Sequence, residues 1–121
     1  MESEIELMDM VLRLVAAAAM GSLIGLEREL HKRPAGLRTH MLVSLGAAAF
    51  LLVGYEILFA TAVGDPSARI DPTRIVEGVI GGIGFLGAGS IIQSRGSIQG
   101  ITTGAAIWIA GAIGVACATG N

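Results

Sequence analysis

Residues 41–63 read MLVSLGAAAFLLVGYEILFATAV, an apolar run with a single charge, Glu56. The hydrocarbon core of a bilayer is about 30 Å thick, and about 20 apolar helical residues are needed to cross it. Outward from this run, Arg13 is the one charge within three further apolar bands, at residues 11–26, 78–92 and 101–119. The mean hydropathy of the whole chain is +0.72. The sequence therefore predicts a protein whose main solvent is lipid.

Helix is the structure that these bands predict, because a helix satisfies its own backbone hydrogen bonds in lipid. Strands of a membrane barrel would alternate apolar and polar residues, and the bands do not. We expect an all-α, polytopic transmembrane bundle of about four glycine-rich helices, at residues 7–27, 39–60, 75–93 and 99–119. Together they would form a single transmembrane domain over residues 1–121, with no soluble C-terminal domain in this chain.

The third band is the shortest of the four. Its fifteen residues, 78–92, would span about 22 Å as a helix. Such a segment crosses the bilayer only if Glu77 and Gln93 lie among the headgroups or the bilayer thins locally. A broken or re-entrant segment is the alternative, which requires protein or water to cover the opened backbone.

Positive charges predict the orientation of the helices. Five lie in the connectors on one side, namely Arg28, Lys32, Arg33, Arg38 and Arg95. Three belong to the other side, namely Arg13, Arg69 and Arg74. Because Lys and Arg are enriched in cytoplasmic loops, we expect the first side to be cytoplasmic and the N-terminus to be external.

Glycine is about twice as frequent here as in average proteins, with 18 in the chain. Spacings of four residues, which let helix backbones approach closely, favour tight packing inside one subunit or between two. A run of five glycines at residues 81–89 favours instead a hinged or opened third helix beside a polar path. The glycines predicted to have one or the other of these roles, helix packing or hinge, are Gly21, Gly25, Gly78, Gly82, Gly84, Gly87, Gly89, Gly100 and Gly104.

Polar residues gather at two places. Glu27 and Arg28 close the first helix, and Arg38 and Thr39 open the second, so the turn between them can bring the four together. An ion pair of Arg38 with Glu27, or of Arg28 with a carboxylate, would make these residues a functional cluster. The alternative is that they are ordinary charged residues at the cytoplasmic helix ends, each exposed to water. Ionisable or hydroxyl groups at membrane depth can mark an ion path, and here they are Glu56, Glu77, Thr102 and Thr103.

Several function classes are disfavoured. A net charge of −2 supplies no strong field to attract nucleic acid, so we expect no nucleic-acid partner. The apolar bands make the lipid bilayer the expected partner. Cys117 is the single cysteine, which excludes an intrachain disulfide and a cysteine-based metal site. No Ser/His or Asp pair lies inside an apolar band, so we expect neither an enzyme nor a cofactor. The sequence leaves a metal site open.

Four segments in this order resemble the membrane domain of the MgtC/SapB family over residues 12–121. They are GLERE (25–29), AGLRTHMLV (35–43), GGIGFLGAG (81–89) and GITTGAAIW (100–108). The resemblance implies a multi-pass protein of the bacterial inner membrane. It also implies that the family's polar motif corresponds to Glu27, Arg28, Arg38, Thr39, Thr102 and Thr103, and its glycine motif to Gly81, Gly82, Gly84, Gly87 and Gly89.

The resemblance further implies a link to growth in low magnesium and to virulence through survival inside host cells. One branch of the family is thought to restrain the F-type ATP synthase. We therefore expect a regulatory membrane protein that contacts helices of a membrane partner such as that synthase. An oligomeric transporter or channel for a cation such as magnesium is the alternative, and in either case a homo-oligomer, with a dimer favoured, is expected.

Overall fold

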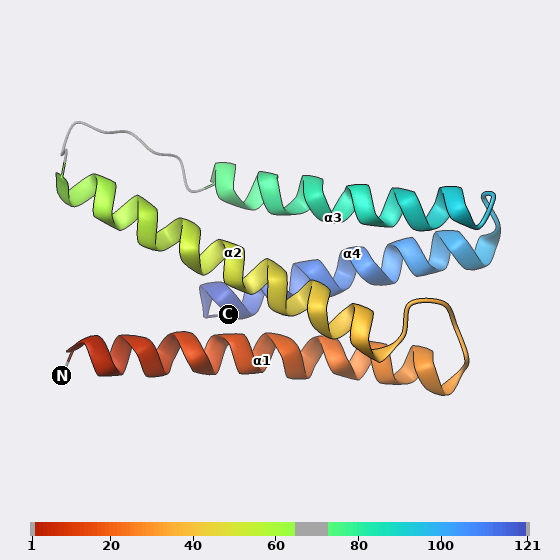
Figure 1. Cartoon of the computed structure of the whole chain (residues 1–121), viewed down its shortest axis with the longest axis horizontal. Coiled ribbons are helices and arrows are strands. Elements are labelled where there is room, and N and C mark those ends of the chain that lie inside the picture. Colours follow the sequence, from red (N-terminus) through yellow and green to blue (C-terminus); the bar gives the residue numbers. More distant parts are fainter. Residues whose placement is uncertain (1, 65–72, 121) are drawn as a thin grey trace.

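The computed structural model describes residues 2–64 and 73–120, with side chains at 7–57 and 73–120 (Figure 1). In these residues the chain forms four helices and no strand. The helices are α1 (Glu2–Leu30), α2 (Leu37–Gly64), α3 (Thr73–Gln93) and α4 (Ile98–Thr119). Each contains a segment long and apolar enough to cross a membrane. The predicted all-α bundle of transmembrane helices is confirmed, and Arg69 of the charge count lies outside the described residues.

The third helix is continuous, which resolves the question raised by its short apolar band. α3 has 21 residues, about 31 Å of helix, because polar residues at both ends extend the band. Glu77 lies in the second turn and Gln93 is the last residue, so both can reach the headgroups while the helix spans. The glycine run at 81–89 does not interrupt this helix.

α4 lies at the centre of the bundle and contacts each of the other three helices. α1 packs mainly along α2, and α3 packs mainly along α4, whereas α2 and α3 touch only slightly. In Figure 1, α1 and α3 flank the crossing pair formed by α2 and α4. One end of the bundle holds the end of α1 and the starts of α2 and α4, and we call it the Arg28 end.

Arg13, the charge inside the first band, is satisfied at the opposite end of the bundle. Its Nη2 lies 3.1 Å from the Asp9 carboxylate, one turn earlier on α1. Its Nη1 donates to the carbonyl of Ala118, in the last turn of α4. A cation at a helix C-terminus meets carbonyls that have no intrahelical donor, so Arg13 ties α1 to α4 there.

Glycines allow the close approach of helix pairs such as α1 with α2 and α3 with α4. A Cβ placed on Gly25 would lie 2.6 Å from Leu37 Cα, and one on Gly21 would lie 2.6 Å from His40 O, so α1 touches the backbone of α2. On α4, a Cβ on Gly104 would lie 3.1 Å from Gly87 O of α3. Close contacts also lie at Gly100, against Ser94, and at Gly111, against Ile83.

The remaining predicted glycines make no such contact within the chain. A Cβ placed on Gly78, Gly82, Gly84 or Gly89 would meet no heavy atom within 4 Å among the described residues. The physical reason is that α3 buries only one face, with Ile83 and Gly87 one turn apart, against the rest of the bundle. Packing of these glycines against a second molecule stays a prediction.

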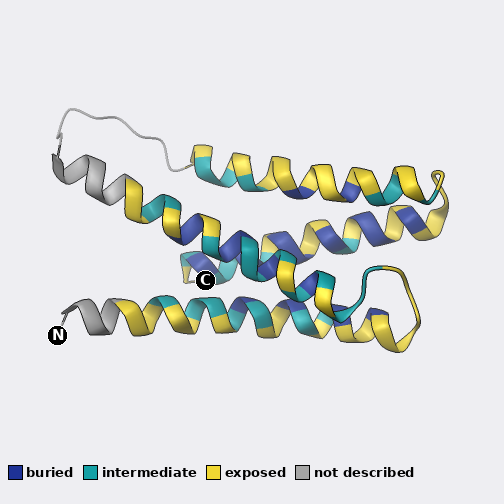
Figure 2. Ribbon diagram, in the orientation of Figure 1, coloured by how far each residue is buried: buried dark blue, intermediate teal, exposed yellow. Residues whose placement is uncertain are grey.

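Exposed residues lie along the outer faces of the helices (Figure 2), and many of them are large and apolar, as a lipid-facing surface requires. Phe85 is 80% exposed, Ile92 76% and Phe50 73%. Most of the fully buried apolar side chains are small, namely Ala17, Ala48, Ala110 and Ala118, and Leu51 is the exception among the described residues. Helices in lipid gain little from burying large apolar residues between them, so small residues that permit close packing fill the interfaces.

We expect Gly25→Ala to lower the stability of the folded bundle by about 1–3 kcal/mol, the usual cost of overpacking. The new methyl would press on the backbone of Leu37, which cannot rotate away. Gly81→Ala is the matched control, because its Cβ would meet open space and alanine favours helix. Thermal unfolding in detergent measures both variants, and equal midpoints would contradict the packing role of Gly25.

Candidate functional site

Arg28 forms the centre of the polar site at the Arg28 end. It lies near the end of α1 and is only 5% exposed. Its Nη2 donates to Pro34 O at 2.8 Å, and its Nε donates to Ala35 O at 3.0 Å. A buried guanidinium needs such acceptors, because a charge removed from water without partners is costly. The side chain therefore holds the connector between α1 and α2 against the end of α1.

The same guanidinium reaches across to α4. Its Nη2 also donates to Thr103 Oγ1, and Thr103 is 1% exposed. The Thr103 hydroxyl donates in turn to Gln99 O at 2.9 Å, one turn earlier on α4. Hydrogen bonds to a charged donor are stronger than neutral ones. One side chain thus links α1, the connector and α4.

Two residues of the connector, Lys32 and Ala35, have φ near +55°. Non-glycine residues rarely adopt this left-handed conformation, which costs free energy unless the surroundings impose it. The Arg28 side chain binds the carbonyls of Pro34 and Ala35. The backbone N–H of Arg33 donates to the Arg28 carbonyl at 2.9 Å. We infer that these bonds around Arg28 stabilise the strained turn.

The predicted polar cluster is only partly assembled. Arg28 and Thr103 meet, but Glu27 and Arg38 are exposed, and Thr39 is half-buried. Glu27 Oε1 lies 3.2 Å from His31 Nδ1, one turn later on the same helix. Among the described side chains, no ion pair joins Arg38 to Glu27 or Arg28 to a carboxylate. The physical reason is that the Nε and Nη2 of Arg28 already donate to backbone carbonyls of the connector.

The residues named for an ion path do not form one cluster. Thr102 and Thr103 lie in the first turns of α4, and each hydroxyl donates to its own helix, to Ile98 O or Gln99 O. Glu77 lies near the start of α3, and Glu56 lies well along α2. Since α3 and α4 run antiparallel, their starts are at opposite ends of the bundle (Figure 1). Both glutamates are exposed within the single chain.

His40 and Ser44 were not singled out from the sequence as site residues. Both side chains are fully buried, one turn apart on α2. His40 Nδ1 bonds to Gly36 O at 2.9 Å, while His40 Nε2 and Ser44 Oγ have no hydrogen-bond partner in the described structure. In the sequence, their four-residue spacing within an apolar helix indicates only that they share one face of that helix. Their burial depends on the close approach of α1 and α4, which the spacing does not predict.

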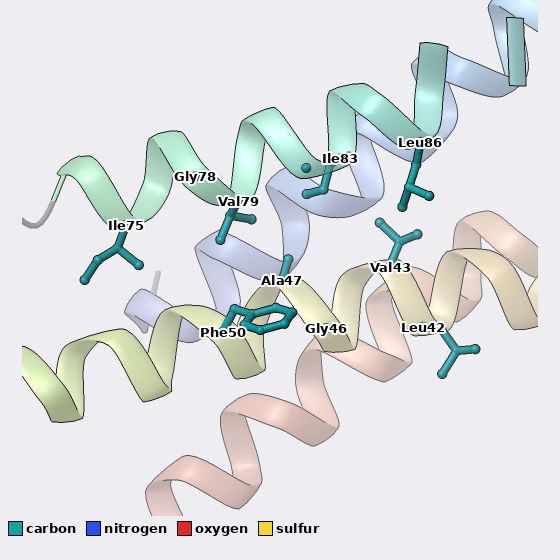
Figure 3. A pocket seen from close by; sticks show the side chains of 11 residues that line it. Leu42, Val43, Gly46, Ala47, Phe50, Ile75, Gly78, Val79, Ile83 and Leu86 are labelled. Carbon is teal, nitrogen blue, oxygen red and sulfur yellow. The ribbon is translucent and has the colours of Figure 1, made fainter. Parts of the chain in front are cut away.

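A second candidate site is a groove of about 640 Å³ between α2 and α3 (Figure 3). We call it the α2–α3 groove. Its lining is apolar or glycine throughout, and includes Val43, Gly46, Ala47, Phe50, Ile75, Gly78, Val79, Gly82 and Leu86. It exists because α3 packs on α4 and touches α2 only slightly. In the described residues, no group of three His, Cys, Asp or Glu side chains could hold a metal ion.

We expect Thr103→Val to destabilise the bundle by about 1–2 kcal/mol, because the Arg28 guanidinium loses one acceptor in a buried position. Thr102→Val is the matched control, since it removes the neighbouring hydroxyl, which is exposed and bonds only its own helix. Thermal unfolding in detergent compares the two. A midpoint that falls equally in both variants would rule out a special role for the Arg28–Thr103 bond.

Comparison with known proteins places this sequence in a family. The MgtC family matches residues 14–121. YhiD of Escherichia coli K12, whose name describes a candidate magnesium transporter, is 39% identical over 112 residues, which cover 93% of this chain and 52% of YhiD. No solved structure matches the chain.

Proteins named MgtC are similarly related. MgtC of Salmonella typhimurium LT2 is 39% identical over 121 residues, all of this chain and 48% of that protein. MgtC of Brucella abortus is 41% identical over 107 residues, 88% of this chain and 41% of that protein. The chain thus spans about half the length of the curated relatives it matches. With a family match over most of its residues, this multi-pass membrane protein belongs to the MgtC family.

Proposed function

We propose that the protein is a regulatory, non-enzymatic protein of the bacterial inner membrane that binds a transmembrane helix of a partner in the α2–α3 groove. The observation that carries this proposal is the groove itself, which is apolar throughout and has glycines on both walls. Following the charge distribution, the Arg28 end is cytoplasmic and the N-terminus is external.

The groove suits a helix because of its small residues. Gly78 and Gly82 lie four apart on α3, and neither is covered by another part of the described chain. Gly46 lies on the opposite wall, where a Cβ would also meet open space. Small residues at such spacing let a second helix backbone approach closely, which gives the dispersion contacts that drive association in lipid.

Two kinds of partner follow from the family. The F-type ATP synthase is the membrane partner that the resemblance implies, and a second copy of this chain would give the expected dimer. The name of the relative YhiD, which mentions magnesium, fits a regulator that responds to magnesium limitation.

Transport of a cation such as magnesium is the second candidate function. It is favoured by the name of the relative YhiD and by the position of Glu77 near the start of the glycine-rich α3. Magnesium prefers carboxylate oxygens and usually keeps several waters. Among the described residues, one chain offers only the separate Glu56, inside an apolar band, and Glu77, beside one. A path would therefore need several copies around a shared axis.

We expect Gly82→Leu to weaken partner association by about fivefold or more, because the larger side chain fills the groove. A photo-crosslinking residue at Phe50, which lines the groove, reports the association in native membranes. Gly84→Leu is the matched control, since Gly84 is equally uncovered on α3 but does not line the groove. Loss of the crosslink in both variants, or in neither, would contradict the proposal.

We expect purified protein in sealed liposomes to show no magnesium flux above that of protein-free vesicles. A regulator that acts through helix contacts needs no conducting path. Glu77→Gln, which removes the charge near the start of α3, is the comparison variant. Flux that the wild-type chain supports and Glu77→Gln reduces would favour the transporter over the regulator.

A further inference from the structure

A basic pocket lies at the Arg28 end, on the side of the bundle where the end of α1 meets the start of α4. Its volume is about 340 Å³. The polar lining comes from two segments far apart in the sequence. Glu27, Arg28, His31 and Arg33 belong to α1 and the connector, and Gln99 and Thr102 belong to α4. We call this set the basic pocket.

The charge of the basic pocket favours an anion. Two arginines face one carboxylate, and Glu27 Oε1 already lies 3.2 Å from His31 Nδ1. The hydrogen bonds of Arg28 use its Nε and Nη2, so Nη1 has no partner within the described chain. Arg28 is nine-tenths buried, so its charge acts in a partly dry environment where attraction to an anion is strengthened.

The start of α4 adds to this preference. Ser97 caps the helix by accepting from the backbone N–H of Gly100 at 3.1 Å. The N–H groups of Ile98 and Gln99 precede the first intrahelical acceptors, so they lack a partner of the helical type. The positive end of a helix dipole attracts phosphate and other anions. Buried Arg28, the second arginine and the helix end thus converge on one cavity.

The pocket also lies where two candidate membrane spans end, which is the expected level of the lipid headgroups. The candidate spans of α1 and α4 end at Leu30 and begin at Ile98. Leu30 and Ile98 are strongly exposed, at 72% and 84%, so apolar surface borders the pocket. Basic pockets between transmembrane helices on the cytoplasmic side are typical sites for anionic headgroups.

We propose that the basic pocket binds a phosphate group at the membrane surface, supplied by an anionic phospholipid or by soluble phosphate. The Arg28 and Arg33 guanidiniums balance the charge, and the start of α4 supplies backbone donors. A ligand of this kind bridges α1, the connector and α4, so it stabilises the same junction that Arg28 and Thr103 hold.

The test measures thermal stabilisation of the full chain in neutral detergent by added phosphatidylglycerol, phosphatidylcholine or inorganic phosphate. A ligand that binds only the folded state raises the midpoint by mass action. We expect phosphatidylglycerol to raise it and phosphatidylcholine to leave it unchanged. Stabilisation by millimolar inorganic phosphate as well would identify soluble phosphate as a source of the same group, whereas no response to either phosphate source would overturn the proposal.

Arg33→Gln and Lys32→Gln form a matched pair of variants. Both residues are exposed neighbours in the connector, but only Arg33 lines the basic pocket. We expect Arg33→Gln to weaken the apparent affinity by about fivefold, the effect of one basic contact at an anionic surface, and Lys32→Gln to leave it unchanged. An equal loss of apparent affinity in both variants would show that the overall charge of the connector attracts the lipid. That result would overturn the proposal that phosphate binds in the pocket.

Gln99→Glu separates binding from folding. A carboxylate in the first turn of α4 stabilises that helix, so the unliganded midpoint should stay the same or rise. The same carboxylate repels phosphate from the pocket, and the response to phosphatidylglycerol should be lost. A retained response in Gln99→Glu would contradict the proposed position of the phosphate.

Discussion

The hydrogen bonds of the Arg28 guanidinium are the interaction on which the polar end of this protein depends. A buried charged side chain must find polar partners, because the hydrocarbon part of a bilayer supplies none. Arg28 finds them in the carbonyls of Pro34 and Ala35 and in the hydroxyl of Thr103. The connector, the end of α1 and the start of α4 are therefore one unit, and the basic pocket borders it.

Glycine has two different roles in the four helices. On α1 and α4 it lets backbones touch, as at Gly25 beside Leu37 and Gly104 beside Gly87. On α3 most of the glycines face outward and leave the helix with an open surface beside α2. Glycine thus allows close packing inside the bundle and also leaves a surface that a further helix could contact. Which of the two roles a glycine of α3 has depends on whether it faces α4.

The two proposed sites lie on different parts of the molecule and differ in chemistry. The α2–α3 groove is apolar and lies along the spanning part of the helices, where a partner helix or lipid would fill it. The basic pocket lies at the Arg28 end and is lined by charged and polar groups. A phosphate group there would act on the junction of α1 and α4, while a helix in the groove would contact α2 and α3.

The sequence by itself determined the number of helices, their approximate bounds and the family, because long apolar bands admit only helices in lipid and the family motifs keep their order. It also identified Arg28 and Thr103 as polar motif positions, although not as partners. Only the tertiary structure decided that carbonyls and a hydroxyl rather than a carboxylate bind Arg28, that His40 and Ser44 are buried, and that most glycines of α3 face outward. The physical reason is that these features depend on which face each helix turns to its neighbours, and apolar bands with little amphipathic asymmetry do not specify that face.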